Sequence, residues 1–91
     1  MNGARAFLDT NVLVYSQDAG EPERMAKAAG FVDGLLNEGR AVISTQVVQE
    51  FVNVMRRGEK PKRSVEECGW WVEFFYERFA VVPASRVLQE N

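Results

Sequence analysis

Short apolar runs alternate with helix-like stretches along this chain, and that alternation limits its fold more than any other feature. The runs at 6–8, 41–43 and 80–82 fit short strands, of which the first is predicted to be buried on both faces and the second is predicted to be buried. Between and after them, caps and apolar stripes at helical spacing predict helices over 22–37, 46–57, 65–79 and, in part, 85–90. This order predicts an α/β fold whose parallel strands are joined by right-handed crossovers. Residues 12–15 fit either a short helix or a longer first strand.

Composition excludes several kinds of chemistry. The 91 residues include no histidine and one cysteine, Cys68, so His-based catalysis, His-ligated zinc and an intrachain disulfide framework are ruled out. The net charge of −2 argues against non-specific coating of nucleic acid. We expect one domain over 1–91 that is soluble and cytoplasmic, because no signal-peptide or membrane-spanning segment is recognisable. Catalysis, if present, must use carboxylates, hydroxyls, Lys or Arg, or a bound hard metal.

Two carboxylates follow the first two expected strands. Asp9 ends the first apolar run, where it is either a ligand or nucleophile or simply the cap of the next turn. Thr10 and Asn11 beside it suit a hydrated cation and equally an ordinary Asx turn. Glu50 falls at the margin of the apolar face of its helix, where it either needs a partner or reaches water. If the two strands are neighbours, both acids meet at one edge of the sheet, an arrangement suited to Mg²⁺ or Mn²⁺.

A basic segment follows the helix that carries Glu50. It contains five of the 11 basic residues of the chain and is either a solvated loop or a phosphate-contacting patch that binds RNA. Its basic members are Arg56, Arg57, Lys60, Lys62 and Arg63.

The helix expected over 65–79 is rich in aromatic residues. One face is predicted to belong to the core and includes Cys68, Phe75 and Tyr76. Trp70 and Phe74 are predicted on the opposite face, where large aromatic side chains commonly mark a subunit interface. A homodimer is therefore expected.

Two motifs resemble those of PIN-domain proteins of the VapC toxin type. They read Phe-Leu-Asp-Thr-Asn-Val-Leu-Val-Tyr over 7–15 and Ser-Thr-Gln-Val-Val-Gln-Glu-Phe over 44–51. The resemblance covers essentially the whole chain and implies a three-layer α/β/α fold with a short parallel sheet. It also implies a Mg²⁺- or Mn²⁺-dependent endoribonuclease, typically the dimeric toxin of a toxin–antitoxin pair, silenced by a cognate antitoxin. By this resemblance Asp9 and Glu50 are metal-binding catalytic acids, and Asn11 and Ser44 support them by hydrogen bonds.

The sequence departs from the family pattern at its C-terminal end. A third acid and usually a fourth are expected on elements beyond residue 91, so the last elements of the fold are predicted to be missing. The alternative function is a non-catalytic PIN-like module that dimerises or binds an antitoxin without cleaving RNA. Another Asp-dependent phosphotransfer fold is less favoured, because a haloacid-dehalogenase-like domain would carry aspartate where Asn11 stands.

Overall fold

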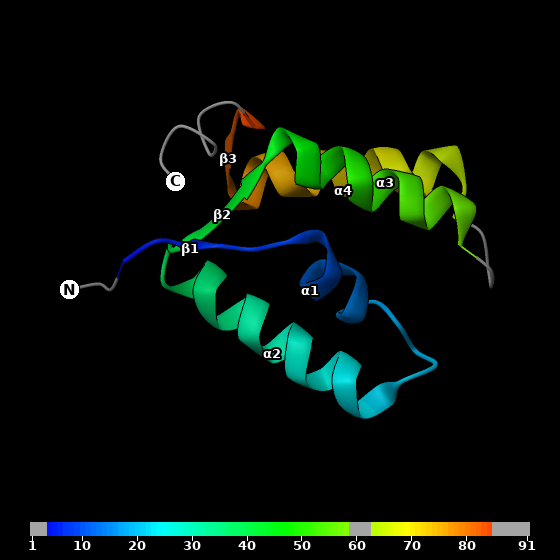
Figure 1. Cartoon of the computed structure of the whole chain (residues 1–91), viewed down its shortest axis with the longest axis horizontal. Helices are drawn as coiled ribbons and strands as arrows, with labels where there is room; N and C mark the ends of the chain where they lie inside the picture. The colour runs from blue at the N-terminus through cyan, green and yellow to red at the C-terminus, as the bar shows by residue number, and fades with distance from the viewer. Residues whose placement is uncertain (1–3, 59–62, 85–91) are drawn as a thin grey trace.

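A computed structural model describes residues 4–58 and 63–84 of the chain. Three strands and four helices alternate along it (Figure 1): β1 (Ala6–Phe7), α1 (Thr10–Tyr15), α2 (Pro22–Asn37), β2 (Ala41–Ser44), α3 (Thr45–Arg57), α4 (Val65–Arg78) and β3 (Ala80–Val82). The helix predicted over 85–90 lies outside the described residues. Within those ranges, no helix combines the length and apolar character that crossing a membrane requires.

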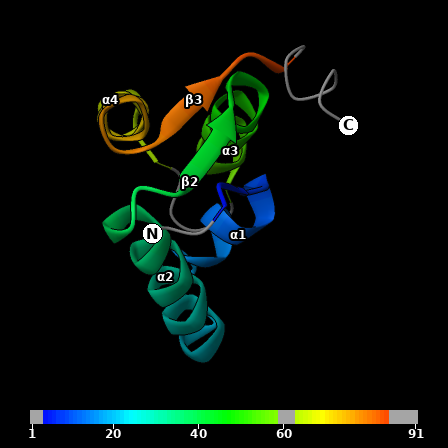
Figure 2. The same ribbon diagram turned by 90° about the vertical axis from the view of Figure 1, so that its left-hand side faces the viewer.

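The three strands form one parallel sheet with β2 at its centre. β1 pairs with β2 through Ala6 opposite Ala41, and β2 pairs with β3 through Ile43 opposite Val81. Figure 1 shows α3 and α4 side by side with α1 and α2 below them, and Figure 2 shows the arrows of β2 and β3 pointing the same way. The predicted α/β class and short parallel sheet are confirmed, and β1 and β2 are neighbours, as the convergence of the two acids requires.

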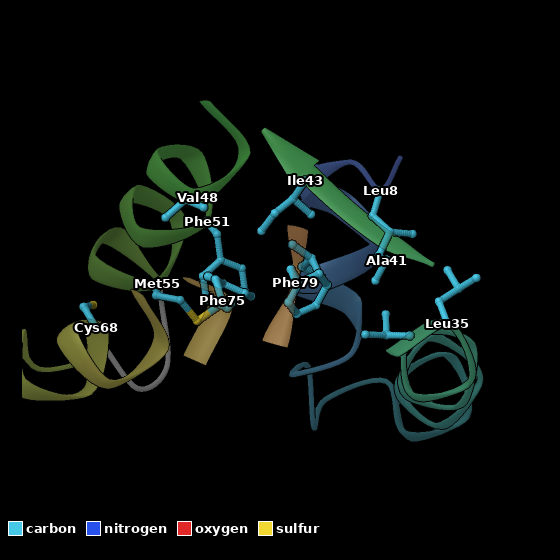
Figure 3. Packing of buried hydrophobic residues seen from close by; sticks show 12 residues of the cluster. Leu8, Leu35, Ala41, Ile43, Val48, Phe51, Met55, Cys68, Phe75 and Phe79 are labelled. Carbon is cyan, nitrogen blue, oxygen red and sulfur yellow. The ribbon is translucent and has the colours of Figure 1, made fainter. Parts of the chain in front are cut away.

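One face of the sheet contributes to a core shared by all four helices. Ala41 and Ile43 are buried in this core, and Figure 3 shows Ile43 pointing from β2 toward the aromatic side chains of the cluster. On the other face, Phe7 is 49% exposed and Ala80 is also exposed. The prediction that the first strand is buried on both faces was wrong, whereas the predicted burial of the second strand is confirmed by all four residues of β2. The described helices pack into a single core on one face of the sheet.

Local sequence signals set the ends of the helices. Pro22 occupies the start of α2, where its missing N–H costs nothing, and Gly39 just after that helix adopts φ +69°, a conformation that favours glycine. Ser44 caps α3 by accepting from the Val47 N–H. Ser64 and Glu67 form the predicted capping box of α4.

The open question about residues 12–15 is resolved in favour of a helix. The Asp9 side chain caps α1 and Leu13 is buried in the core, at 2% exposure. In a continuous strand Asp9 and Leu13 would lie on the same face, because side chains alternate between faces with a period of two residues. The helix instead lets Leu13 pack inward while Asp9 remains at the surface.

Two predictions for the aromatic helix need correction. Tyr76, expected in the core, is 55% exposed, and Phe74, expected on the outer face, packs against the core cluster. Trp70 is 58% exposed, as expected, and stacks on Phe74 with a ring-centroid separation of 5.4 Å. The buried residues of α4 are Cys68 and Phe75.

Candidate metal centre

Asp9 lies at the carboxyl end of β1 and has a structural role. Its Oδ1 accepts a hydrogen bond of 3.1 Å from the Val12 N–H, which caps α1. The side chain is exposed, and within the described ranges its second oxygen accepts no hydrogen bond. The cap and ligand interpretations are therefore compatible, because the cap uses one carboxylate oxygen and the other makes no hydrogen bond to the described residues.

Glu50 lies in the second turn of α3 and has two hydrogen-bond partners. The Thr10 hydroxyl donates to Oε1 at 2.8 Å, and the Gln46 side-chain amide donates to Oε2 at 3.2 Å. Glu50 is exposed, so both predicted alternatives describe it in part: its side chain reaches water and its carboxylate also has partners. Its orientation is nevertheless fixed, because both oxygens accept a hydrogen bond.

The hydrogen bond from Thr10 brings the two acids to one region of the surface. Thr10 directly follows Asp9, and 40 positions of sequence separate it from Glu50. This agrees with the predicted convergence at the carboxyl ends of β1 and β2. Glu50 is thus held beside the turn that contains Asp9.

A hollow of about 230 Å³ opens beside Asp9. Its lining comes from the end of β1 and the start of α3: Phe7, Leu8, Asp9, Ser44 and Val47. A water molecule occupies about 30 Å³ in the liquid, so the hollow has room for a cation with several of its waters. Neither Glu50 nor Thr10 is part of this lining, and the hydrogen bond between them is related to the hollow only because Thr10 directly follows Asp9 in the chain.

The two predicted supporting residues differ in their surroundings. Ser44 is buried, at 9% exposure, and its hydroxyl oxygen accepts from the Val47 N–H at 3.1 Å while the hydroxyl hydrogen can still be donated. Asn11 is exposed as the second residue of α1, and its side chain makes no hydrogen bond to the described residues. Ser44 is part of the lining of the hollow. Asn11 is not part of that lining and directly follows Thr10, the residue that donates to Glu50.

The predicted RNA-binding residues are only partly described. Arg56 and Arg57 are exposed in the last turn of α3. Arg63 forms an ion pair with Glu67 at 3.3 Å, and its side chain is 27% exposed. Lys60 and Lys62 lie outside the described residues. The two arginines of α3 are thus the most accessible described members of this group.

Sequence reasoning missed the two partners of Glu50. Gln46 precedes Glu50 by four residues on one helix, and this spacing places the side chains on the same face, so the contact was open to prediction. The Thr10 contact joins α1 to α3 and depends on how those helices pack. No local sequence pattern predicts how α1 packs against α3.

The donor set of this region fits a hydrated Mg²⁺ or Mn²⁺ ion. Among residues 4–58 and 63–84, no three His, Cys, Asp or Glu side chains group as a metal site. Mg²⁺ is nevertheless commonly held by one or two carboxylates and keeps several waters, so Asp9 and Glu50 are sufficient in type and number for that mode. Ser44 and Thr10 add hydroxyl groups that can bind those waters.

Comparison with known proteins identifies the family. The model of the PIN domain matches residues 6–89, a range that includes both candidate acids and the whole sheet. PIN domains are generally nucleases and typically use divalent metal ions. No curated protein matches the chain significantly. The match extends over most of the sequence, and the chain belongs to the PIN domain family.

Proposed function

We propose that this chain is an endoribonuclease that hydrolyses RNA phosphodiesters with Mg²⁺ or Mn²⁺ held by Asp9 and Glu50. The observation that carries the proposal is the 2.8 Å hydrogen bond from Thr10 to Glu50, which keeps the second acid beside the first. Nuclease activity as such is typical of the family. The choice of RNA rests on the resemblance of the two acid-bearing motifs to VapC-type toxins.

Each residue of the centre has a defined task in this proposal. Asp9 offers its uncapped oxygen to the cation, and Glu50 offers an oriented carboxylate from α3. The Ser44 hydroxyl holds the first turn of α3 and can donate to a water or a phosphate oxygen in the hollow. The bound cation would supply an activated water and offset the charge that develops on the phosphate.

Divalent-metal dependence is the first expected property. The purified chain should cleave a labelled RNA with Mg²⁺ or Mn²⁺, lose that activity in EDTA, and regain it when the metal is returned. The reason is that Asp9 and Glu50 alone provide neither an activated water nor a positive charge for the phosphate. A DNA strand of the same sequence is the matched substrate. Background cleavage of RNA under every metal condition would contradict the proposal and favour the non-catalytic module.

Arg57 is the basic residue best placed to guide RNA to this centre. It follows Glu50 by seven residues, two helical turns, so the two side chains lie on one face about 10 Å apart along the axis of α3. Arg56 is also exposed but is turned about 100° away from Arg57 around the helix. The two arginines therefore form a natural pair for comparison.

Replacing Arg57 with Ala should weaken RNA binding and lower its salt dependence. A lost phosphate contact on a single strand reduces the slope of log affinity against log salt by about 0.7. Arg56→Ala should change the slope much less, because its side chain points away from the face of Glu50. Fluorescence anisotropy with labelled RNA in EDTA measures both without cleavage. Equal slopes for the two variants would reject a specific role for Arg57.

We further propose that the chain acts as a homodimeric toxin controlled by a cognate antitoxin. The toxin assignment is supported by the motif over 7–15 and by the motif that contains Glu50. The dimer is supported by Trp70, which is 58% exposed and lies flat against Phe74. An exposed indole of this kind is enriched in protein interfaces.

A further inference from the structure

Glu50 is the only described carboxylate whose two oxygens accept side-chain hydrogen bonds from two different residues. Thr10 donates to one oxygen at 2.8 Å and Gln46 donates to the other at 3.2 Å. An exposed glutamate normally samples several rotamers, and ordering it costs conformational entropy when a ligand binds. In this chain the two hydrogen bonds already order the Glu50 side chain, so less conformational entropy is lost when a cation binds.

The two partners constrain Glu50 in different ways. Gln46 belongs to α3 itself, so its bond orients the carboxylate relative to its own helix. Thr10 is the first residue of α1, so its bond connects α3 to another element of the fold. Because Thr10 directly follows Asp9, the bond also relates the position of Glu50 to that of Asp9.

We propose that Thr10 is a positioning residue of the metal centre, which acts through Glu50 and fixes its carboxylate relative to Asp9. The inference rests on the proposed function, since it assumes that both carboxylates hold one cation. A carboxylate oxygen can accept a hydrogen bond and bind a metal at the same time, because it has more than one lone pair. Hydrogen-bonded partners that orient metal ligands commonly change metal affinity by about 10- to 100-fold.

The test measures Mn²⁺ binding directly, by the electron paramagnetic resonance signal of free Mn²⁺ in the absence of RNA. Thr10→Val keeps the branched shape but removes the hydroxyl, and it should raise the Mn²⁺ dissociation constant about 10-fold. Thr10→Ser restores the hydroxyl and should recover most of that affinity. A merely structural role for Thr10 would show no such dependence on the hydroxyl.

Thr45→Val is the matched control. Thr45 is the exposed first residue of α3, as Thr10 is the first residue of α1, but its hydroxyl makes no bond to Glu50. This variant should bind Mn²⁺ like the wild type. A thermal unfolding midpoint of each variant within about 5 °C of the wild type shows that the fold is retained.

Gln46→Leu gives an independent variant in case Thr10→Val does not fold. It removes the bond to the second oxygen and should weaken Mn²⁺ binding, but by less than Thr10→Val because Gln46 makes no connection to α1. Gln49→Leu on the same helix is its control, since Gln49 is exposed and directly precedes Glu50. Equal affinities for these two variants would contradict a role for the second bond.

The outcomes separate this inference from the proposed function. If the wild type binds Mn²⁺ and Glu50→Gln abolishes binding, but Thr10→Val binds as well as the wild type, the positioning role is wrong and the metal centre stands. If the wild type binds no Mn²⁺, the proposed centre fails and the role of Thr10 fails with it. Weaker binding for Thr10→Val, recovery for Thr10→Ser and no change for Thr45→Val support the inference.

Discussion

Asp9→Asn and Glu50→Gln should each reduce Mg²⁺-dependent RNA cleavage by about 10²- to 10³-fold. Each substitution removes a negative charge from the proposed ligand set while keeping the size and shape of the side chain. A bound metal contributes several kcal/mol to transition-state stabilisation, and each 1.36 kcal/mol corresponds to a factor of about ten in rate. Time courses with labelled RNA at fixed Mg²⁺ measure the effect.

The amide variants isolate charge from structure. Asparagine is as good a helix cap as aspartate, so Asp9→Asn should preserve α1. Glu73→Gln on the exposed surface of α4 is the control for loss of an acid elsewhere and should cleave like the wild type. Wild-type rates in Asp9→Asn or Glu50→Gln would remove that residue from the proposed catalytic pair.

Phe75→Ala should be the most damaging core substitution. Phe75 is 1% exposed, and its ring packs edge-on against Phe51 at 4.9 Å and against Phe79 at 5.4 Å. Truncating a buried phenylalanine costs about 3–5 kcal/mol through lost transfer energy and the cavity left behind. A chain of this length is stable by roughly 5–14 kcal/mol, so the variant should lose a large share of its stability. Urea unfolding followed by circular dichroism measures the difference.

Tyr76→Ala provides the comparison on the same helix. Tyr76 is the next residue and is 55% exposed, so its removal should change the unfolding free energy by about 0.5 kcal/mol or less. Similar losses for the two variants would show that α4 packs through a different face. Phe75→Leu should fall between them, because leucine refills part of the cavity.

Much of the fold was predictable because local chemistry decides it. Pro22, Gly39, Ser44 and Ser64 mark helix ends by their backbone or capping preferences, and the structure places helix ends beside all four. The burial of β1 was not predictable in this way. An apolar run does not reveal which face of its strand the helices cover, and Phe7 is half exposed because its side chain lies on the face of the sheet opposite the core that the described helices share.

The two acids of the candidate site were predictable from the sequence, but the hydrogen bond that relates their positions was not. Asp9 and Glu50 were identified from their places after apolar runs, and strand pairing then made β1 and β2 neighbours. The link between them depends on Thr10, whose hydroxyl also fits an ordinary turn. Only the packing of α1 against α3 shows that the Thr10 hydroxyl binds Glu50 and does not merely form part of a turn. Tertiary packing also decided the outcome for α4, where Tyr76 was predicted in the core but is exposed, and Phe74 was predicted on the outer face but packs against the core.

The most direct test of the metal centre is where Mn²⁺ binds. Substoichiometric Mn²⁺ broadens the amide signals of nearby residues in an ¹⁵N-correlated NMR spectrum of the wild-type chain. We predict selective loss of the signals of Asp9, Thr10, Ser44 and Glu50, while those of Glu73 and Glu77 on α4 persist. Losses centred on the acids of α4, or spread evenly over all exposed acids, would contradict a cation site built from Asp9 and Glu50.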